Sequence, residues 1–191
     1  MRIVLASGSV YRGALLRRLV DDFVVDSPQI DETRHDSESP EALASRLAAA
    51  KTAAVAPRHA DAVVIGSDQV AEWEGVLLGK PADHAAAVAQ LSASSGKIVR
   101  FLTSVVVQNT QSGREQSHLD VTEVRFRDLT ADEIERYLLT EQPYDCAGSF
   151  KSEGSGIALF ERISSEDPTA LVGLPLIWLA GALRNEGLQL P

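Results

Sequence analysis

The chain has 191 residues, 45% of them hydrophobic, a length and composition typical of one globular domain with its own core. Its 27 acidic residues outnumber its 18 basic ones and give a net charge of −9. This balance argues against a groove that tracks DNA or RNA, because such a groove needs an excess of positive charge. Nucleic acid is therefore not expected as a partner. Small phosphorylated ligands stay open, since they need only a local cluster of cations.

The single cysteine and the short apolar runs indicate in which cellular compartment the protein is expected. A single cysteine, Cys146, excludes an intramolecular disulfide and fits a reducing environment, so we expect a cytoplasmic protein. The first apolar run covers only residues 3–6, which is too short for an export signal. The most apolar stretch, 170–183, contains a glycine and a proline and falls short of the ~20 residues of a spanning helix. We therefore expect no membrane segment.

Hydrophobic periodicity and turn residues predict strands and helices along the whole chain. Strands are expected over residues 2–6, 23–25, 62–65, 70–73, 76–78, 98–108, 116–126 and 157–160. Helices are expected over residues 14–20, 40–56, 83–91, 131–139 and 176–183. Two helix starts carry capping signals, Ser39 before Pro40 and the capping box of Thr130 with Glu133. Gly66 is expected to end the strand over 62–65.

A polar cluster of Ser67, Asp68 and Gln69 follows this buried strand. Ligands of open α/β sheets bind beyond the carboxyl ends of strands, which favours a functional site here. The Asp68 carboxylate can bind a hydrated divalent cation or take a proton from water. A hairpin over 70–78 would return Lys80 towards it, opposite one phosphate chain. The alternative is that Asp68 is a turn residue that bonds its own backbone.

The segment 7–13 lies between the first strand and the first helix. Such a junction offers backbone N–H groups to an anion, with the Ser7 and Ser9 hydroxyls and Arg12 as further donors. The alternative is that Ser9 only caps the helix while Arg12 is solvated.

A second polar concentration covers residues 145–156, where three glycines near Lys151 and Glu153 suggest close approach of a ligand to the backbone. Cys146 has no recognisable base partner and is expected to be buried and inert. Lys51 lies on an alanine-rich helix, where an isolated lysine is expected to face solvent.

Together these residues resemble the Maf family of nucleotide pyrophosphatases. The resemblance covers nearly the whole chain and rests on the order of its motifs: Ser7-x-Ser9-x-x-Arg12, Asp31-Glu32, Lys51, Gly66-Ser67-Asp68-Gln69, Gly79-Lys80-Pro81, Ala147-Gly148-Ser149-Phe150-Lys151-x-Glu153-Gly154 and Gly173-Leu174-Pro175-Leu176. The form of the segment 145–153, with Asp167-Pro168-Thr169 further on, is similar to the branch that hydrolyses 7-methyl-GTP. The branch that prefers dTTP and UTP usually carries a different version.

The resemblance implies an α/β fold related to inosine triphosphatases, with an elongated mixed sheet, flanking helical lobes and a central cleft in one domain over 1–191. It implies hydrolysis of a nucleoside triphosphate to the monophosphate and pyrophosphate, by water attack at the α-phosphorus with a divalent cation, Mg²⁺ or Mn²⁺. The residue roles that it implies are proton acceptance by Asp68, cation binding by Glu32 and Asp68, phosphate binding by Ser7, Ser9, Arg12, Lys51, Lys80 and Lys151, and base choice by Tyr11, Gln69 and Glu153. Family behaviour and the apolar last helix suggest a homodimer.

The chain departs from the family pattern at two positions. Val10 replaces the usual proline, and Gly13 stands where a second arginine is common. Arg17 or Arg18, one turn on, are candidates to replace the missing guanidinium. Two other functions stay open at this point: a pyrophosphatase for dTTP, UTP or non-standard nucleotides, and a nucleotide-binding regulator of cell division with little turnover.

Overall fold

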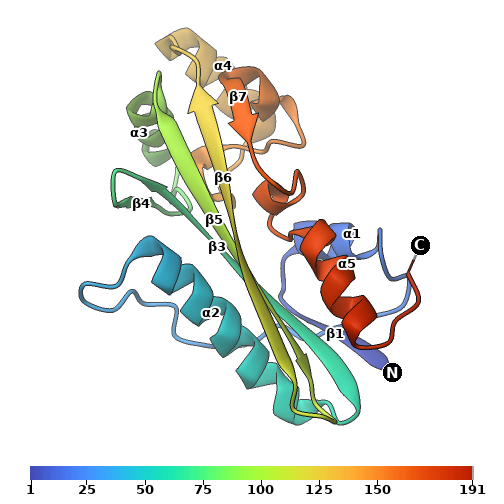
Figure 1. Cartoon of the computed structure of the whole chain (residues 1–191). Coiled ribbons are helices and arrows are strands. Elements are labelled where there is room, and N and C mark those ends of the chain that lie inside the picture. Colours follow the sequence, from blue (N-terminus) through green and yellow to red (C-terminus); the bar gives the residue numbers. More distant parts are fainter. Residues whose placement is uncertain (191) are drawn as a thin grey trace.

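A computed structural model describes residues 1–190 and is built on three long strands, β3 (Ala62–Trp73), β5 (Ile98–Asn109) and β6 (Glu115–Phe126). They pair antiparallel and run side by side along the length of the molecule (Figure 1). The seven-stranded sheet has the order β2-β1-β3-β5-β6-β7, with β4 paired to β3. Its shorter strands are β1 (Arg2–Ala6), β2 (Val24–Val25), β4 (Val76–Leu78) and β7 (Phe160–Ser164). The expected elongated mixed α/β fold is confirmed.

Helices flank the sheet on both sides. Helix α2 (Pro40–Val55) lies along one side of the long strands, while α1 (Val10–Leu16) and α5 (Leu176–Asn185) lie on the other (Figure 1). The remaining helices, α3 (His84–Ser94) and α4 (Ala131–Glu141), gather at the far end of the sheet. Short 3₁₀ turns cover Ala56–Arg58, Ala147–Ser149, Ser155–Leu159 and Ala170–Val172. None of the helices in residues 1–190 has the length and apolar character to span a membrane.

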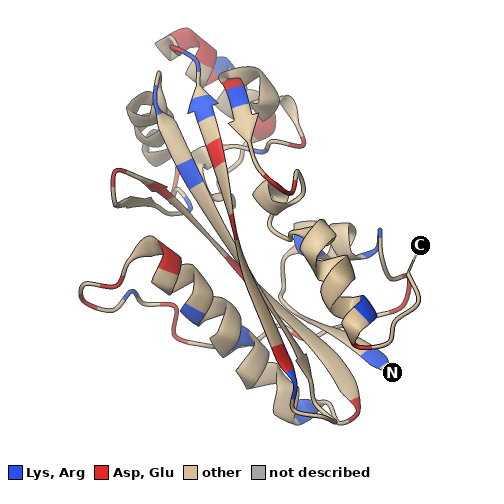
Figure 2. Cartoon of the chain, in the orientation of Figure 1, with Lys and Arg blue, Asp and Glu red and all other residues tan. Residues whose placement is uncertain are grey.

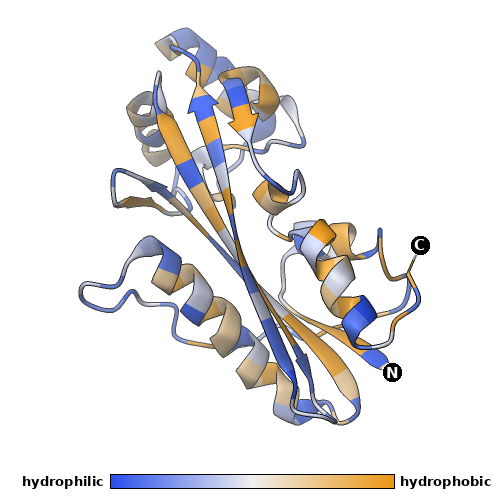
Figure 3. Ribbon diagram, in the orientation of Figure 1, coloured by the Kyte–Doolittle hydropathy of each residue, from blue (hydrophilic) through white to orange (hydrophobic). Residues whose placement is uncertain are grey.

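The core is divided by the sheet because the central strands are apolar on both faces. On one face Leu5, Ile65 and Val105 pack against α1 and α5, whereas on the other Val4 and Val64 pack against the end of α2. Apolar bands mark α5 and the strand segments beneath it (Figure 3). A separate cluster at the far end contains four phenylalanines in edge-to-face contact, Phe101, Phe126, Phe150 and Phe160. The space between these clusters is where the polar residues of the middle of β3 lie.

The predicted strand break at Gly66 is wrong, because β3 continues through this residue to Trp73. The glycine is needed instead for contact with α2. A Cβ atom at this position would lie 2.1 Å from Thr52 Oγ1 and 2.7 Å from the Ala48 carbonyl oxygen. Ala6, the last residue of β1, pairs with Gly66, so the polar cluster lies beyond the carboxyl end of β1 rather than that of β3.

Two other boundaries differ from expectation. The first helix begins at Val10 rather than at residue 14, because Ser9 caps it by accepting a hydrogen bond from the Arg12 amide. It ends at Leu16, where tighter i→i+3 bonds replace the helical ones. The strand expected over 157–160 is a 3₁₀ turn, and β7 begins only at Phe160. The hairpin of β3 and β4 and the capping box of Thr130 are confirmed.

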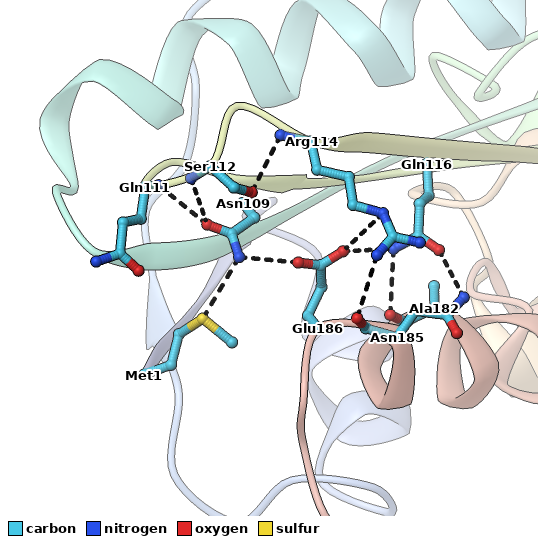
Figure 4. A network of polar contacts seen from close by, with 9 residues as sticks. All are labelled: Met1, Asn109, Gln111, Ser112, Arg114, Gln116, Ala182, Asn185 and Glu186. Carbon is cyan, nitrogen blue, oxygen red and sulfur yellow. Dashed lines mark hydrogen bonds and ion pairs between the residues drawn. The ribbon is translucent and has the colours of Figure 1, made fainter.

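A polar network fastens the C-terminal helix to the β5–β6 hairpin (Figure 4). The carboxylate of Glu186, only 4% exposed, accepts hydrogen bonds from Asn109 Nδ2 at 2.8 Å and from Gln116 Nε2 at 2.7 Å. Asn109 Oδ1 in turn accepts from the backbone amides of Gln111 and Ser112 and so shapes the turn. The network therefore holds the end of α5 against the β5–β6 hairpin.

Candidate active site

A cleft of about 780 Å³ extends from the polar middle of β3 to the cluster of phenylalanines at the far end of the sheet. Its walls come from the segment before α1 and α1 itself, α2, the middle of β3, the end of β4, and two loops over 145–153 and 171–173. Nearly all sequence-predicted site residues line it: Ser7, Ser9, Tyr11, Arg12, Glu32, Lys51, Asp68, Gln69, Lys80 and Glu153. The fold therefore brings together motifs that are far apart in the chain. Lys and Arg are spread over helices and strands among acidic residues rather than confined to one element (Figure 2).

Lys51 and Asp68 form the centre of the site. Lys51 Nζ lies 2.6 Å from Asp68 Oδ1 and 2.8 Å from Glu32 Oε1. Taken alone, Lys51 was expected to face solvent, and this expectation is wrong, since the residue is 8% exposed. The cause is the close packing of α2 on β3 at Gly66, which places the residue before Thr52 beside the polar part of the strand.

Burial makes Asp68 a better base than an exposed aspartate. The residue is 6% exposed, and loss of solvation raises the pKa of its carboxyl group, while the charge and hydrogen bond of Lys51 oppose this rise. Oδ1 accepts the hydrogen bond from Lys51, and the residue lines the cleft. A carboxylate in this position can take a proton from a water molecule.

Arg12 is held in place by backbone and hydroxyl oxygens. Its Nε donates to the Gly173 carbonyl oxygen at 2.9 Å, and one terminal nitrogen donates to Ser7 Oγ at 3.3 Å. Burial lowers the pKa of the guanidinium, and the carboxylates of Asp68 and Glu32 raise it. The group is a cation because a guanidinium does not lose its proton in proteins. It therefore offers its remaining N–H groups to an anion in the cleft.

The Gly173 carbonyl that binds Arg12 belongs to the loop over 170–173, which is hydrogen-bonded to side chains of β3. The single proton of Ser67 Oγ lies between two acceptors, the Ser104 carbonyl at 2.8 Å and the Gly173 carbonyl at 3.0 Å. Gln69 Nε2 donates to the carbonyls of Ala170 and Leu171, each at 3.0 Å. The polar residues of β3 thus serve two purposes. Asp68 and Gln69 line the cleft, and Ser67 and Gln69 hold the loop over 170–173.

The other basic residues differ in their placement. Lys80 is exposed and lines the same cleft as Asp68, as the hairpin predicted. Lys151 does not line it: Nζ donates to the Glu141 carbonyl at 3.3 Å and lies 3.8 Å from Asp145 Oδ1. Arg17 places its guanidinium over the Phe23 ring, outside the cleft lining, so it does not fill the role of the missing second arginine in this structure.

The cleft is apolar where it meets the cluster of phenylalanines at the far end of the sheet, and its lining there also includes acidic residues. Phe101, Phe150 and Leu78 line it together with Tyr11 and Glu153. Sequence reasoning missed Asp145 as a lining residue; its position beside Cys146 at the start of the polar stretch was the available signal.

Cys146 also lines the cleft and is half-buried, so the expectation of full burial is wrong. Loss of solvation and the adjacent Asp145 carboxylate raise the pKa of its thiol to about 11. The thiol is therefore un-ionised at neutral pH, in agreement with an inert residue.

The carboxylates of the cleft fit a divalent cation that binds together with the phosphates of a substrate. No group of three or more His, Cys, Asp or Glu side chains suited to a metal forms within residues 1–190. Glu32 and Asp68, however, share the ammonium of Lys51 and so lie close together at the polar end of the cleft. Mg²⁺ is commonly held by one or two carboxylates plus substrate phosphates and water. These two carboxylates meet that requirement.

Comparison with known proteins identifies the class. The family model described as Maf-like protein matches residues 2–186, so the chain belongs to the Maf family. The chain is 57% identical over 190 residues to the 7-methyl-GTP pyrophosphatase of Xanthomonas axonopodis pv. citri, a match that covers 100% of this chain and 99% of the relative. It is 52% identical to the protein of the same name from Alcanivorax borkumensis, with 99% and 96% covered, and 55% identical to that of a Polaromonas species, with 98% and 86% covered.

Proposed function

We propose that this protein hydrolyses 7-methyl-GTP to 7-methyl-GMP and pyrophosphate. The observation that carries the proposal is a buried carboxylate, Asp68, paired with Lys51 in a cleft that also presents Arg12 and Lys80. Full-length identities above 50% to relatives named 7-methyl-GTP pyrophosphatase support the choice of substrate.

The chemistry follows from the charges at the polar end of the cleft. Asp68 takes a proton from the water that attacks the α-phosphorus, and its raised pKa makes it a stronger base than a solvated aspartate. Arg12, Lys51 and Lys80 bind phosphate oxygens, with the Ser7 hydroxyl beside them, and stabilise the negative charge that builds up on the leaving pyrophosphate. A divalent cation held by Glu32 and Asp68 would supply further neutralisation of this charge. We propose Mg²⁺ or Mn²⁺ for this cation.

The other predicted roles are part of the same proposal. Ser9, which caps α1, and Lys151, whose segment borders the cleft, are assigned to phosphate binding. Tyr11, Gln69 and Glu153 are assigned to the choice of base. Methylation at N7 leaves the guanine ring cationic, so a carboxylate at the apolar end and an aromatic ring that can stack on the base both favour it over neutral guanine. We also propose a cytoplasmic homodimer, on the basis of the single cysteine and the apolar α5.

The experiment is pyrophosphate release from 7-methyl-GTP, GTP, dTTP, UTP and ITP with Mg²⁺ or Mn²⁺. We expect turnover of 7-methyl-GTP well above that of the others. Glu153→Gln should reduce the preference for 7-methyl-GTP over GTP, and an unchanged preference would contradict the role of this carboxylate. Tight nucleotide binding without pyrophosphate release by the wild type would instead support the regulator, and dominant release from dTTP, UTP or ITP would point to the other substrate classes.

A further inference from the structure

A hydrogen bond joins the two walls of the cleft at its apolar end. Tyr11, in the first turn of α1, donates from its hydroxyl to Asp145 Oδ2 at 3.3 Å, across 134 residues of sequence. Both residues line the cleft. The Asp145 side chain is 60% exposed, so its charge is in contact with solvent rather than held in a packed core.

The hydroxyl of Tyr11 is the donor in this contact. Loss of solvation, together with the neighbouring Cys146 and Asp145, raises the pKa of the phenol, so it stays protonated at any physiological pH. At 3.3 Å the O–H···O contact is long, so it directs the phenol hydroxyl towards Asp145 without locking the ring. The contact therefore places an aromatic ring and a negative charge side by side at the apolar end.

The charges around this pair are unevenly distributed. Three cations among residues 1–190 line the cleft: Arg12 is engaged by Ser7 and Gly173, and Lys51 by Asp68 and Glu32. The third, Lys80, is exposed and is assigned above to the phosphates. Lys151 does not line the cleft, and its amine is shared between an ion pair with Asp145 at 3.8 Å and a hydrogen bond to the Glu141 carbonyl at 3.3 Å, so it offsets the Asp145 charge only in part. Glu153 adds a second carboxylate to the lining. A base that sits there meets two carboxylates and an aromatic ring, a combination that attracts a cation.

We infer that Asp145 is a specificity-determining residue, which directs the Tyr11 side chain at one wall of the base site and adds a negative charge that selects a cationic, N-alkylated purine over its neutral parent. The inference deepens the proposed function and rests on it for the identity of the substrate. It differs from the role given to Glu153, because Asp145 acts through an aromatic side chain of the opposite wall as well as through its charge.

Three variants separate these contributions. Asp145→Asn keeps an acceptor for the Tyr11 hydroxyl and removes the charge together with its ion pair to Lys151, whereas Tyr11→Phe keeps the ring and removes only the hydrogen bond. Glu161→Gln, which removes a carboxylate that is 55% exposed on β7, controls for the change in net charge. The measured quantity is the ratio of kcat/KM for 7-methyl-GTP to that for GTP.

We expect Asp145→Asn to lower this ratio by about fivefold, the size of a partly exposed charge interaction, through loss of 7-methyl-GTP activity alone. Tyr11→Phe should lower it less, and Glu161→Gln should leave it unchanged. An unchanged ratio in Asp145→Asn, or an equal loss on both substrates, would overturn the inference, since a merely structural role affects both alike.

Binding of nucleosides keeps this test independent of catalysis. The affinities of 7-methylguanosine and guanosine for wild type and Asp145→Asn can be measured by calorimetry without any phosphate chemistry. If the wild type releases no pyrophosphate, the proposed function fails. The inference then stands if the wild type prefers the methylated nucleoside and Asp145→Asn loses that preference, and it falls if the preference is absent or unaffected.

Discussion

Gly66→Ala tests the contact that places α2, and with it Lys51, on the sheet. The added Cβ would lie 2.1 Å from Thr52 Oγ1, 2.7 Å from the Ala48 carbonyl oxygen and 2.9 Å from the Thr52 amide nitrogen. Two of these atoms are backbone, so a side-chain rotation cannot relieve the clash. Helix and strand must separate, in a region where the neighbouring residues are fully buried.

Overpacking of this kind costs about 3 kcal/mol, the upper part of its usual range, because a backbone shift is required. For a chain of this size about 2–4 °C of Tm are lost per kcal/mol, so we expect a fall of about 6–12 °C in calorimetry. Lys51 would move with the helix, so pyrophosphate release should fall even below the Tm.

Two further variants make the reasoning falsifiable. Thr52→Ala removes the nearest clashing atom, so the double variant with Gly66→Ala should recover part of the lost Tm. Gly13→Ala is the matched control in a helix, where the new Cβ would have only an ordinary contact, 3.7 Å from an Arg17 nitrogen. It should raise stability by about 0.5–1 kcal/mol. A Tm of Gly66→Ala equal to that of the wild type would refute the explanation.

The remaining predictions concern the site and two stabilising contacts. Lys51→Met leaves the Asp68 carboxylate buried without its paired cation, so the pKa of Asp68 should rise further. We expect kcat/KM at neutral pH to fall about 10²–10³-fold and to recover in part as the pH is raised. A loss that is the same at every pH would contradict this. Glu133 accepts hydrogen bonds from the Thr130 amide and hydroxyl and lies near Arg127, which lowers its pKa from 4.5 to about 2. Its contribution to the free energy of unfolding is therefore complete above pH 4.5 and lost as the pH falls towards about 2, and Glu133→Gln should flatten this part of the urea-unfolding profile. Glu186→Ala removes the carboxylate that accepts from Asn109 and Gln116 and pairs with Arg114. Gln116 keeps the Ala182 carbonyl as an acceptor, whereas the Asn109 amide is left with the weak Met1 sulfur, so the variant should cost about 1–3 kcal/mol in urea unfolding, while an exposed control, Glu161→Ala, should cost little.

Most strands and helices could be predicted from the sequence because their signals are local. Apolar runs, the capping box of Thr130 and the hairpin turn before Val76 depend on neighbours in the chain, and all three are confirmed. The prediction at Gly66 was wrong because its cause is not local. Glycine weakens a strand, but here it is required by contact with a helix more than ten residues away in sequence.

The site residues could be named from motif order, but their arrangement could not. Nothing in the alanine-rich helix around Lys51 indicates that its amine lies between two carboxylates, because burial of a lysine depends on tertiary packing. Asp145 was missed because its partner, Tyr11, is at the other end of the chain. Lys151 belongs to a matched motif, yet its amine turns to the end of α4, and its role in phosphate binding stays a prediction.

The central claim is that Asp68 activates water for attack at the α-phosphorus. The most direct measurement is mass spectrometry of the products formed from 7-methyl-GTP in water labelled with a heavy oxygen isotope, for wild type and Asp68→Asn. We predict that the label enters 7-methyl-GMP and not pyrophosphate, and that Asp68→Asn forms neither product at a comparable rate. Label in the pyrophosphate, release of orthophosphate, or full activity of Asp68→Asn would contradict the account.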